Sequence, residues 1–253
     1  MGKAKKLKEQ RKIERIEQAQ RKENRRKILM RAVFGISILI IIFGGAYLGG
    51  IYAKNNWNNS KAATTTSSSK TNNSQATITR KYSKAPAMTI DANKNYTADV
   101  ETNLGDFDIA LDAKDTPITV NNFVFLASHQ FYNGLTFHRI IKDFMIQGGD
   151  PNGNGTGGPG YKFNDEKIVG DYTPGTVAMA NSGANTNGSQ FFIMTGDYSN
   201  GKLPKDYVIF GKVSSGMDTV MKINDVKVTG NGQGQTSKPV SSVIIKKVTI
   251  NES

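Results

Sequence analysis

A run of 22 consecutive uncharged residues, 32–53, constrains the fold of this chain more than any other feature. Its centre, Ile36–Phe43, is almost entirely aliphatic. As a helix rising about 1.5 Å per residue, the run would span about 33 Å, enough to cross a hydrocarbon core of about 30 Å. A core helix of a globular domain does not need so long an uncharged run. We therefore predict a single transmembrane helix at 32–53.

The flanking charges predict the orientation of this helix. Residues 1–31 carry 13 Lys and Arg against 4 Glu, and few basic residues follow the span closely. This asymmetry places the N-terminus in the cytoplasm and everything after residue 53 outside it. A cleaved signal peptide is the alternative. It agrees less well with so long a basic segment, and no Ala-x-Ala site follows closely.

The predicted helix has polar segments on both sides. Residues 1–31 are expected to form a basic cytoplasmic tail that lies on anionic headgroups. Residues 54–95 are rich in Ser, Thr, Asn and Lys, and they predict a flexible linker. The net charge of +12 comes from these segments, because residues 96–253 carry 13 basic and 16 acidic residues. We therefore expect no nucleic-acid partner for the folded domain.

The chain has no cysteine and only two histidines. This composition excludes disulfides, thiolate metal ligands and a cysteine nucleophile, and it argues against a His-rich zinc site. A serine hydrolase would need a histidine within reach of a serine. His129 lies near a predicted helix end and is expected at the surface. His138 precedes Arg139 in a strand pattern, so the two point to opposite faces, and His138 is expected to be a hydrogen-bonded interior residue.

One glycine pattern formally matches a dinucleotide-binding fingerprint. It consists of Gly153, Gly155 and Gly158 at the required spacing. A true fingerprint opens a helix that receives the pyrophosphate, whereas Pro159-Gly160 follows here and no helical pattern begins. We interpret the segment as a structural loop, and we expect no cofactor and no metal.

The globular domain is expected at 96–253 and to be mostly β. Alternating segments predict a hairpin of 96–102 and 107–111. Thr116-Pro117 begins a helix, and a second helix is expected at Met217–Ile223. Further strands are expected at 136–141, 144–148, 176–180, 190–195, 207–213 and 243–250. Many short strands with two helices favour an antiparallel barrel or sandwich.

Arg139 is the leading candidate for a functional residue because of the residues around it in the sequence. Phe144, Met145, Phe192 and Leu203 offer apolar surface, and Gln147, Asn181 and Gln190 offer amide donors and acceptors. Apolar residues alone would indicate a core, and an arginine with amides alone would indicate a solvated face. The combination favours a half-polar groove for an extended peptide.

Three sequence blocks resemble the cyclophilin family of peptidyl-prolyl isomerases in order and spacing. They are Phe137-His138-Arg139-Ile140-Ile141, Phe144-Met145-Ile146-Gln147-Gly148-Gly149-Asp150, and Met179-Ala180-Asn181 with Asn185-Thr186-Asn187-Gly188-Ser189-Gln190-Phe191-Phe192. The resemblance covers about 96–250 and implies a closed eight-stranded antiparallel barrel capped by two helices. The barrel would be preceded by the transmembrane helix and the flexible linker.

The resemblance also implies the roles of individual residues. Arg139 and Gln190 would be catalytic, with Gln190 orienting the arginine. The residues implied to bind substrate are Phe144, Met145, Gln147, Thr156, Ala180, Asn181, Phe192, Leu203 and Tyr207. Lys202 stands where many eukaryotic relatives have a tryptophan, which argues against tight cyclosporin binding. Tyr207 stands where they have a histidine, and it should still close the pocket.

These features together predict a membrane-tethered prolyl isomerase. It would act as a monomer on proline-containing segments of exported proteins. The alternative is a non-catalytic module, tethered in the same way, that only binds such segments. The same groove would serve both functions, although the presence of Arg139 and Gln190 favours catalysis.

Overall fold

The computed structural model describes residues 78–232 and 234–253. The predicted tail, the predicted transmembrane helix and residues 54–77 of the predicted linker lie outside this range. Among the described residues, no helix combines the length and apolarity that a membrane crossing requires.

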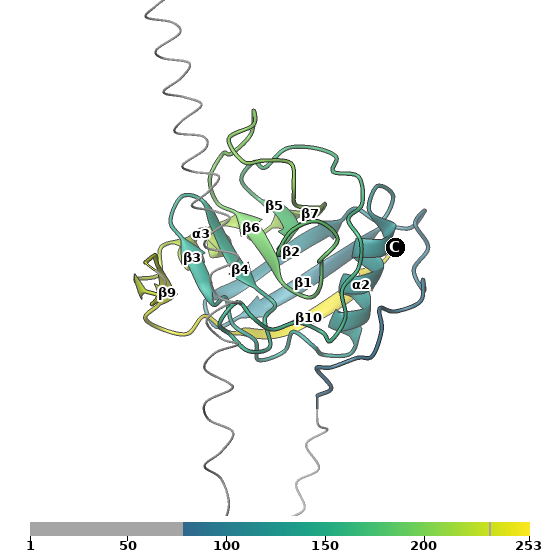
Figure 1. Cartoon of the computed structure of the whole chain (residues 1–253), viewed down its shortest axis with the longest axis horizontal. Helices are drawn as coiled ribbons and strands as arrows, with labels where there is room; N and C mark the ends of the chain where they lie inside the picture. Colours follow the sequence, from purple (N-terminus) through teal and green to yellow (C-terminus); the bar gives the residue numbers. More distant parts are fainter. Residues whose placement is uncertain (1–77, 233) are drawn as a thin grey trace, which may run out of the picture. The chain divides into compact units, whose positions relative to one another are not determined.

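An eight-stranded antiparallel sheet dominates the described part of the chain (Figure 1). Its strands run in the order β10-β1-β2-β7-β5-β6-β4-β3. The strand bounds are β1 Tyr96–Thr102, β2 Gly105–Leu111, β3 Arg139–Ile141, β4 Met145–Gly148, β5 Thr176–Met179, β6 Phe191–Met194, β7 Ile209–Ser215 and β10 Ile245–Glu252. A separate hairpin pairs β8 Val228–Gly230 with β9 Thr236–Pro239.

Strand β1 shows why the sequence alternates. Tyr96, Ala98, Val100 and Thr102 are buried, and the residues between them are partly or fully exposed. β1 pairs with β2, which follows it directly, and with β10, which lies about 150 residues later. Backbone hydrogen bonds of 3.0 Å run in both directions between Asn95 and Ser253 and continue this pairing. β1 is therefore hydrogen-bonded to β10, the last strand in the chain, along its whole length.

The two edge strands of the sheet are β10 and β3, and the segment before β3 is hydrogen-bonded to the start of β10 and the residues before it. Gly134 N donates to Ile245 O, Ile245 N donates to Leu135 O, and Phe137 N donates to Val243 O. These bonds join the segment leading into β3 to the start of β10, so the sheet is strongly curled.

Two helices accompany the sheet in the described residues, α2 Pro117–Ser128 and α3 Met217–Asn224. α2 begins with proline at its first helical position, as predicted. Its free N–H groups are capped from a distant loop, because the Glu166 carboxylate accepts from Ile118 N at 3.0 Å and Thr119 N at 2.7 Å. The buried face of α2 joins an aromatic core whose rings lie 4.9–5.7 Å apart: Phe123, Tyr132, Phe191 and Phe210.

The predicted elements agree with the structure. Each strand and helix predicted within residues 96–253 is present, with bounds that differ by at most three residues. The β8–β9 hairpin was not predicted, because its strands are short and polar and lack an alternating apolar pattern. In Figure 1 it lies at the opposite end of the domain from α2.

The described part of the predicted linker, residues 78–95, corrects the expectation of a free tether. This segment, which we call the strap, packs on the domain. Asn121 of α2 accepts from Thr89 N at 2.9 Å and donates to Ala87 O at 2.9 Å. Tyr82 N donates to Pro159 O at 2.7 Å, and the Tyr82 ring lies 5.1 Å from that of Phe125. Composition alone misses such a segment, because its partners are supplied by the domain.

We expect removal of the strap to destabilise the domain. A fragment of 96–253 should unfold with a free energy about 2 kcal/mol lower than that of 78–253, because the buried Asn121 amide loses its partners. Urea unfolding of both fragments measures the difference. Asn121→Ala in the longer fragment should account for much of it. Equal midpoints for the two fragments would contradict a stabilising role.

Candidate active site

A row of four side-chain positions crosses the outer face of the sheet. Arg139 of β3 lies opposite Gln147 of β4, Gln147 lies opposite Phe192 of β6, and Phe192 lies opposite Ala178 of β5. The alternation of each strand places the neighbours Ile140, Ile146, Ile193 and Val177 in the core instead. The sheet register therefore brings the predicted arginine, amide and aromatic ring onto one surface.

A chain of hydrogen bonds fixes the polar half of this surface. Arg139 Nη1 donates to Gln147 Oε1 at 3.0 Å, and Gln147 Nε2 donates to Gln190 Oε1 at 3.0 Å. Gln190 Nε2 then donates to the carbonyls of Gly155 and Gly157, at 3.1 and 2.8 Å. Because a guanidinium can only donate, each amide in the chain has a single possible orientation. Gln190 thus reaches the arginine through Gln147 and does not touch it.

The guanidinium of Arg139 is largely desolvated but stays charged. Burial lowers the pKa of Arg139 to about 10, and the nearby Tyr207 phenol opposes this shift. The residue remains cationic throughout the neutral range. Nε and Nη1 have protein partners, whereas Nη2 donates to no acceptor among the described residues and is not one of their buried unpaired atoms. Its two hydrogens are therefore free to meet a ligand.

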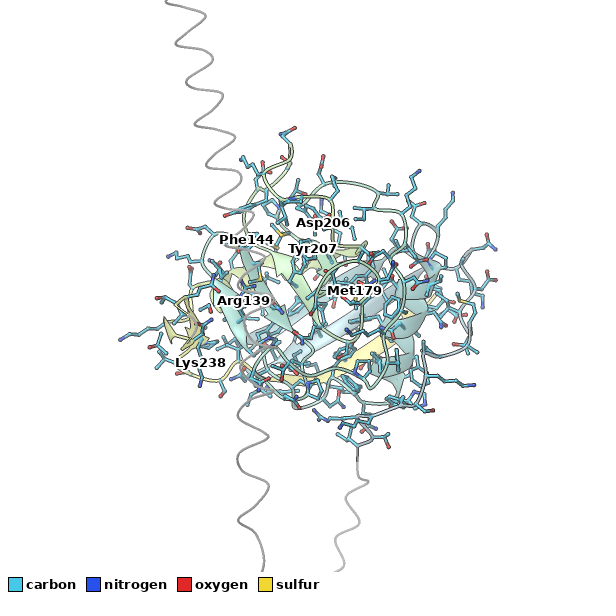
Figure 2. All side chains as sticks on the ribbon, viewed as in Figure 1. Arg139, Phe144, Met179, Asp206, Tyr207 and Lys238 are labelled. Atoms are coloured by element: carbon cyan, nitrogen blue, oxygen red, sulfur yellow. The ribbon has the colours of Figure 1, made fainter. Side chains whose placement is uncertain are left out.

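Apolar side chains form the other half of the surface. Met145, Phe192, Leu203 and Tyr207 are all less than a tenth exposed, and Phe144 is half-buried. The Tyr207 ring stands edge-on to that of Phe192 at 5.5 Å. The Tyr172 hydroxyl holds the Tyr207 backbone by donating to its carbonyl and accepting from its N–H. Arg139, Phe144 and Tyr207 are labelled in Figure 2.

The glycine-rich loop beside this surface is organised by one carboxylate. Asp150 is 1% exposed and accepts from the backbone N–H groups of Asn152, Asn154 and Gly155 at 2.5–2.9 Å. At Gly157 a Cβ would lie 2.0 Å from Asp150 Oδ1, so no other residue is tolerated without movement. The segment is a structural loop, as the sequence predicted, and no helix begins directly after it.

The other predicted binding residues lie in loops at the margin of this surface. Thr156 is exposed between the two carbonyls that Gln190 binds. Ala180 N donates to Gln190 O at 3.0 Å, and this bond extends the pairing of β5 with β6. Asn181 was predicted to bind substrate. Its Nδ2 instead donates to Asp206 O at 2.8 Å, and this bond joins two loops.

Two further residues contact the predicted site and were not predicted. The ring of Tyr198 lies 4.4 Å from that of Phe144 and extends the apolar wall. Gln235, next to β9, accepts a hydrogen bond from Arg139 Nε at 3.2 Å. An aromatic residue in an exposed loop was the only available signal for Tyr198. No local pattern indicated Gln235.

His138 is interior as predicted, but its backbone contact with Thr136 falls short of a hydrogen bond of normal geometry. Both ring nitrogens are buried and have no hydrogen-bond partner among the described residues. Burial lowers the pKa of His138; the Asp150 carboxylate and the Thr136 contact oppose this shift, and the Arg139 charge adds to it. His138 is therefore neutral in the folded protein at pH 7. His129 lies at the surface by the end of α2, as predicted, with its Nδ1 2.8 Å from Phe125 O.

The neutral His138 makes stability depend on pH. Its folded-state pKa lies below the unfolded value of about 6.5, so the unfolded chain takes up a proton first as the pH falls. The contribution of neutral His138 to the free energy of unfolding is fully present above about pH 6.5. As the pH is lowered further, the free energy of unfolding should decrease by up to about 1.4 kcal/mol per pH unit. Urea unfolding between pH 5 and 7.5 measures this slope. His138→Gln should flatten it and the control His129→Gln should not. Identical slopes in all three proteins would contradict the assignment.

The arrangement supports binding and polarisation more than bond cleavage. In residues 78–232 and 234–253, no three His, Cys, Asp or Glu side chains are grouped to hold a metal ion. A fixed cation with two free hydrogens beside an apolar wall can bind a carbonyl or a lone pair of an extended peptide. These features define a surface on a curled antiparallel sheet, polar in one half and apolar in the other.

Known proteins are similar to this chain in sequence and in fold. The family model described as cyclophilin type peptidyl-prolyl cis-trans isomerase matches residues 97–250. The chain belongs to this family and is a cyclophilin-type peptidyl-prolyl cis-trans isomerase.

Its relatives come from distant organisms. The probable peptidyl-prolyl cis-trans isomerase A of Mycobacterium leprae is 42% identical over 62% of this chain and 93% of its own. The peptidyl-prolyl cis-trans isomerase-like 3 of Gallus gallus is 42% identical over 60% of this chain and 94% of its own. The chain spans only 23% of a 44% identical mouse relative, the peptidylprolyl isomerase domain and WD repeat-containing protein 1.

A solved structure agrees with these sequence matches. The cyclophilin-type isomerase of Cryptosporidium parvum superposes with a TM-score of 0.56 at 36% identity, covering 63% of this chain and 99% of that one. The same protein has also been crystallised in the presence of the dipeptide Ala-Pro, with the same TM-score.

Proposed function

We propose that this chain is a membrane-tethered prolyl isomerase that acts outside the cytoplasm on exported proteins. The observation that carries its chemistry is the guanidinium of Arg139, held on two sides and free at Nη2 beside an apolar wall. The sequence supports the tether with the uncharged run at 32–53 and the basic residues before it. The protein works as a monomer. The hydrogen bonds between 134–137 and 243–245 support closure of its sheet into a barrel.

Rotation of an X-Pro bond needs no nucleophile, acid or metal. Its barrier of about 18–20 kcal/mol arises from amide resonance. As the bond twists, the proline nitrogen loses conjugation and its lone pair becomes localised. Arg139 Nη2 donates to this lone pair more strongly in the twisted state than in the planar one. The difference lowers the barrier, because only interactions that strengthen in the transition state accelerate a reaction.

The remaining residues hold the substrate in place. Phe144, Met145, Phe192 and Leu203 receive the proline ring, and Tyr207 closes the pocket. Gln147, Asn181 and the backbone of Ala180 bind the neighbouring peptide groups, and Thr156 borders the groove. Gln190 acts on Arg139 through Gln147 and fixes the glycine-rich loop with its other end.

Cis-to-trans relaxation of a short X-Pro peptide tests the catalytic part. Uncatalysed exchange takes tens of seconds at 25 °C, so acceleration by the full chain in detergent and by fragment 78–253 is readily measured. Equal acceleration by both would locate the activity in the described domain. No acceleration by either folded protein would instead favour the non-catalytic module that binds proline-containing segments.

Protease accessibility tests the tether and its orientation. In intact cells carrying the full chain, added protease should remove the domain and leave a membrane-bound N-terminal fragment. A variant with Ile40→Lys and Ile41→Lys should lose membrane retention, because charged residues are costly at the centre of a bilayer. Recovery of the unmodified chain in the soluble fraction would overturn the proposed anchor.

A further inference from the structure

We propose that Gln235 is a positioning residue that orients Arg139 for catalysis; this inference rests on the proposed function. Gln235 Oε1 lies 3.2 Å from Arg139 Nε, on the edge of the guanidinium that Gln147 does not reach. The two acceptors come from opposite sides of β3, Gln147 from β4 and Gln235 from the β8–β9 hairpin. Lys238 marks this hairpin beside Arg139 in Figure 2.

Two acceptors restrict a guanidinium more than one does. A single hydrogen bond to Nη1 leaves the planar group free to turn about the Cδ–Nε bond and to move with its flexible aliphatic stem. A second bond at Nε fixes the plane, because both donors belong to one rigid fork. Nη2 is then the only nitrogen left for a ligand. Gln235 therefore selects which edge of Arg139 the substrate meets.

The hairpin holds Gln235 rigidly enough for this role. Gln235 N donates to Asn231 Oδ1 at 3.2 Å, and Gln235 O accepts from Asn231 N at 2.8 Å. Asn231 Nδ2 also donates to Ser237 Oγ, and Ser237 is 1% exposed. The backbone of Gln235 is thus fixed at both of its polar groups. The Gln235 side chain can therefore hold Arg139 in place without the entropy cost of ordering a mobile backbone.

The hairpin does not depend on Gln235 for its own structure. Its strands pair through Val228, Thr229 and Gly230, and Val240 N donates to Lys227 O at 2.8 Å. The Gln235 side chain makes its bond to Arg139 and not to the paired strand. Replacing this side chain should leave the hairpin folded and release the guanidinium.

A double-mutant cycle in the full chain tests the inference. Gln235→Leu, which removes the acceptor, should lower kcat for X-Pro isomerisation about 5–10-fold with KM changed less than twofold. Gln235→Glu, which keeps an acceptor of the same length, should stay within twofold of wild type. In an Arg139→Ala background, Gln235→Leu should have no further effect, because Gln235 acts only through the arginine. Thr236→Ala is the matched control in the same hairpin.

The outcomes separate the inference from the proposed function. An inactive wild type would overturn the proposed function itself. An active wild type that Arg139→Ala disables but Gln235→Leu leaves unchanged would overturn only the role of Gln235. Equal losses from Gln235→Leu with and without Arg139 would show a purely structural effect and would also overturn it.

Discussion

Arg139→Ala should lower kcat/KM for X-Pro isomerisation about 100–1000-fold, the usual effect of removing one preorganised transition-state donor. Nη2 is the only donor of the guanidinium without a protein partner in the described residues. No other cation belongs to the row across β3, β4, β6 and β5. Cis-to-trans relaxation of a short peptide, followed at several substrate concentrations, measures the loss.

Arg139→Lys distinguishes geometry from charge. A lysine cannot bond to Gln147 and Gln235 at once and still present a donor to the substrate, so we expect most of the loss to persist. Both variants should unfold within about 1 kcal/mol of wild type, because Arg139 is at the groove surface rather than in the core. Retention of more than a tenth of the activity by Arg139→Ala would overturn the proposed mechanism.

Asp150→Ala should destabilise the domain by about 3 kcal/mol, since three backbone N–H groups lose a charged acceptor. The loop 152–157 would then move away, and Gln190 would lose the carbonyls of Gly155 and Gly157. We therefore expect activity to fall about 10-fold even at temperatures where the variant is folded, because effects of this kind follow from small misplacements. Urea unfolding and the relaxation assay measure the two effects.

Asp150→Asn is the matched control for this prediction. It keeps the shape of the side chain and one acceptor oxygen, so its destabilisation should be about half as large. A loss of less than 1 kcal/mol in Asp150→Ala would mean that water replaces the carboxylate, and that the loop does not depend on it.

The alternation of residues along a strand predicts which side chains share a face of the sheet. Arg139 stands in a short alternating strand, so counting residues placed His138 and Arg139 on opposite faces. Phe192 lies in a strand that is buried throughout, so its face could not be counted in the same way. The family blocks supplied the register between strands that are about 50 residues apart in the chain. The same reasoning placed His138 inside but could not reveal its lack of partners, since hydrogen bonds depend on atoms that the local sequence does not contain.

The features that were missed depend on contacts between distant and irregular segments. The strap is polar and resembles a linker, yet Asn121, about 30 residues away, supplies its partner. Gln235 follows a polar turn that contains three glycines and one asparagine, and its contact with Arg139 joins residues 96 positions apart. Gln190 was expected to orient Arg139, and its hydrogen bond goes to Gln147, which lies between them because β4 separates β3 from β6 in the sheet.

The pairing of β1 with β10 sets an order of events during synthesis. β1 leaves the ribosome early, but one of its two neighbours is residues 245–252, so its backbone donors on that side stay unpaired until the last strand has been made. Contacts between such distant segments form slowly, because a long loop must close first. During that interval the nascent domain exposes an open strand edge of the kind that pairs with other chains. A folding catalyst of this design would therefore itself need protection from aggregation until its final residues emerge.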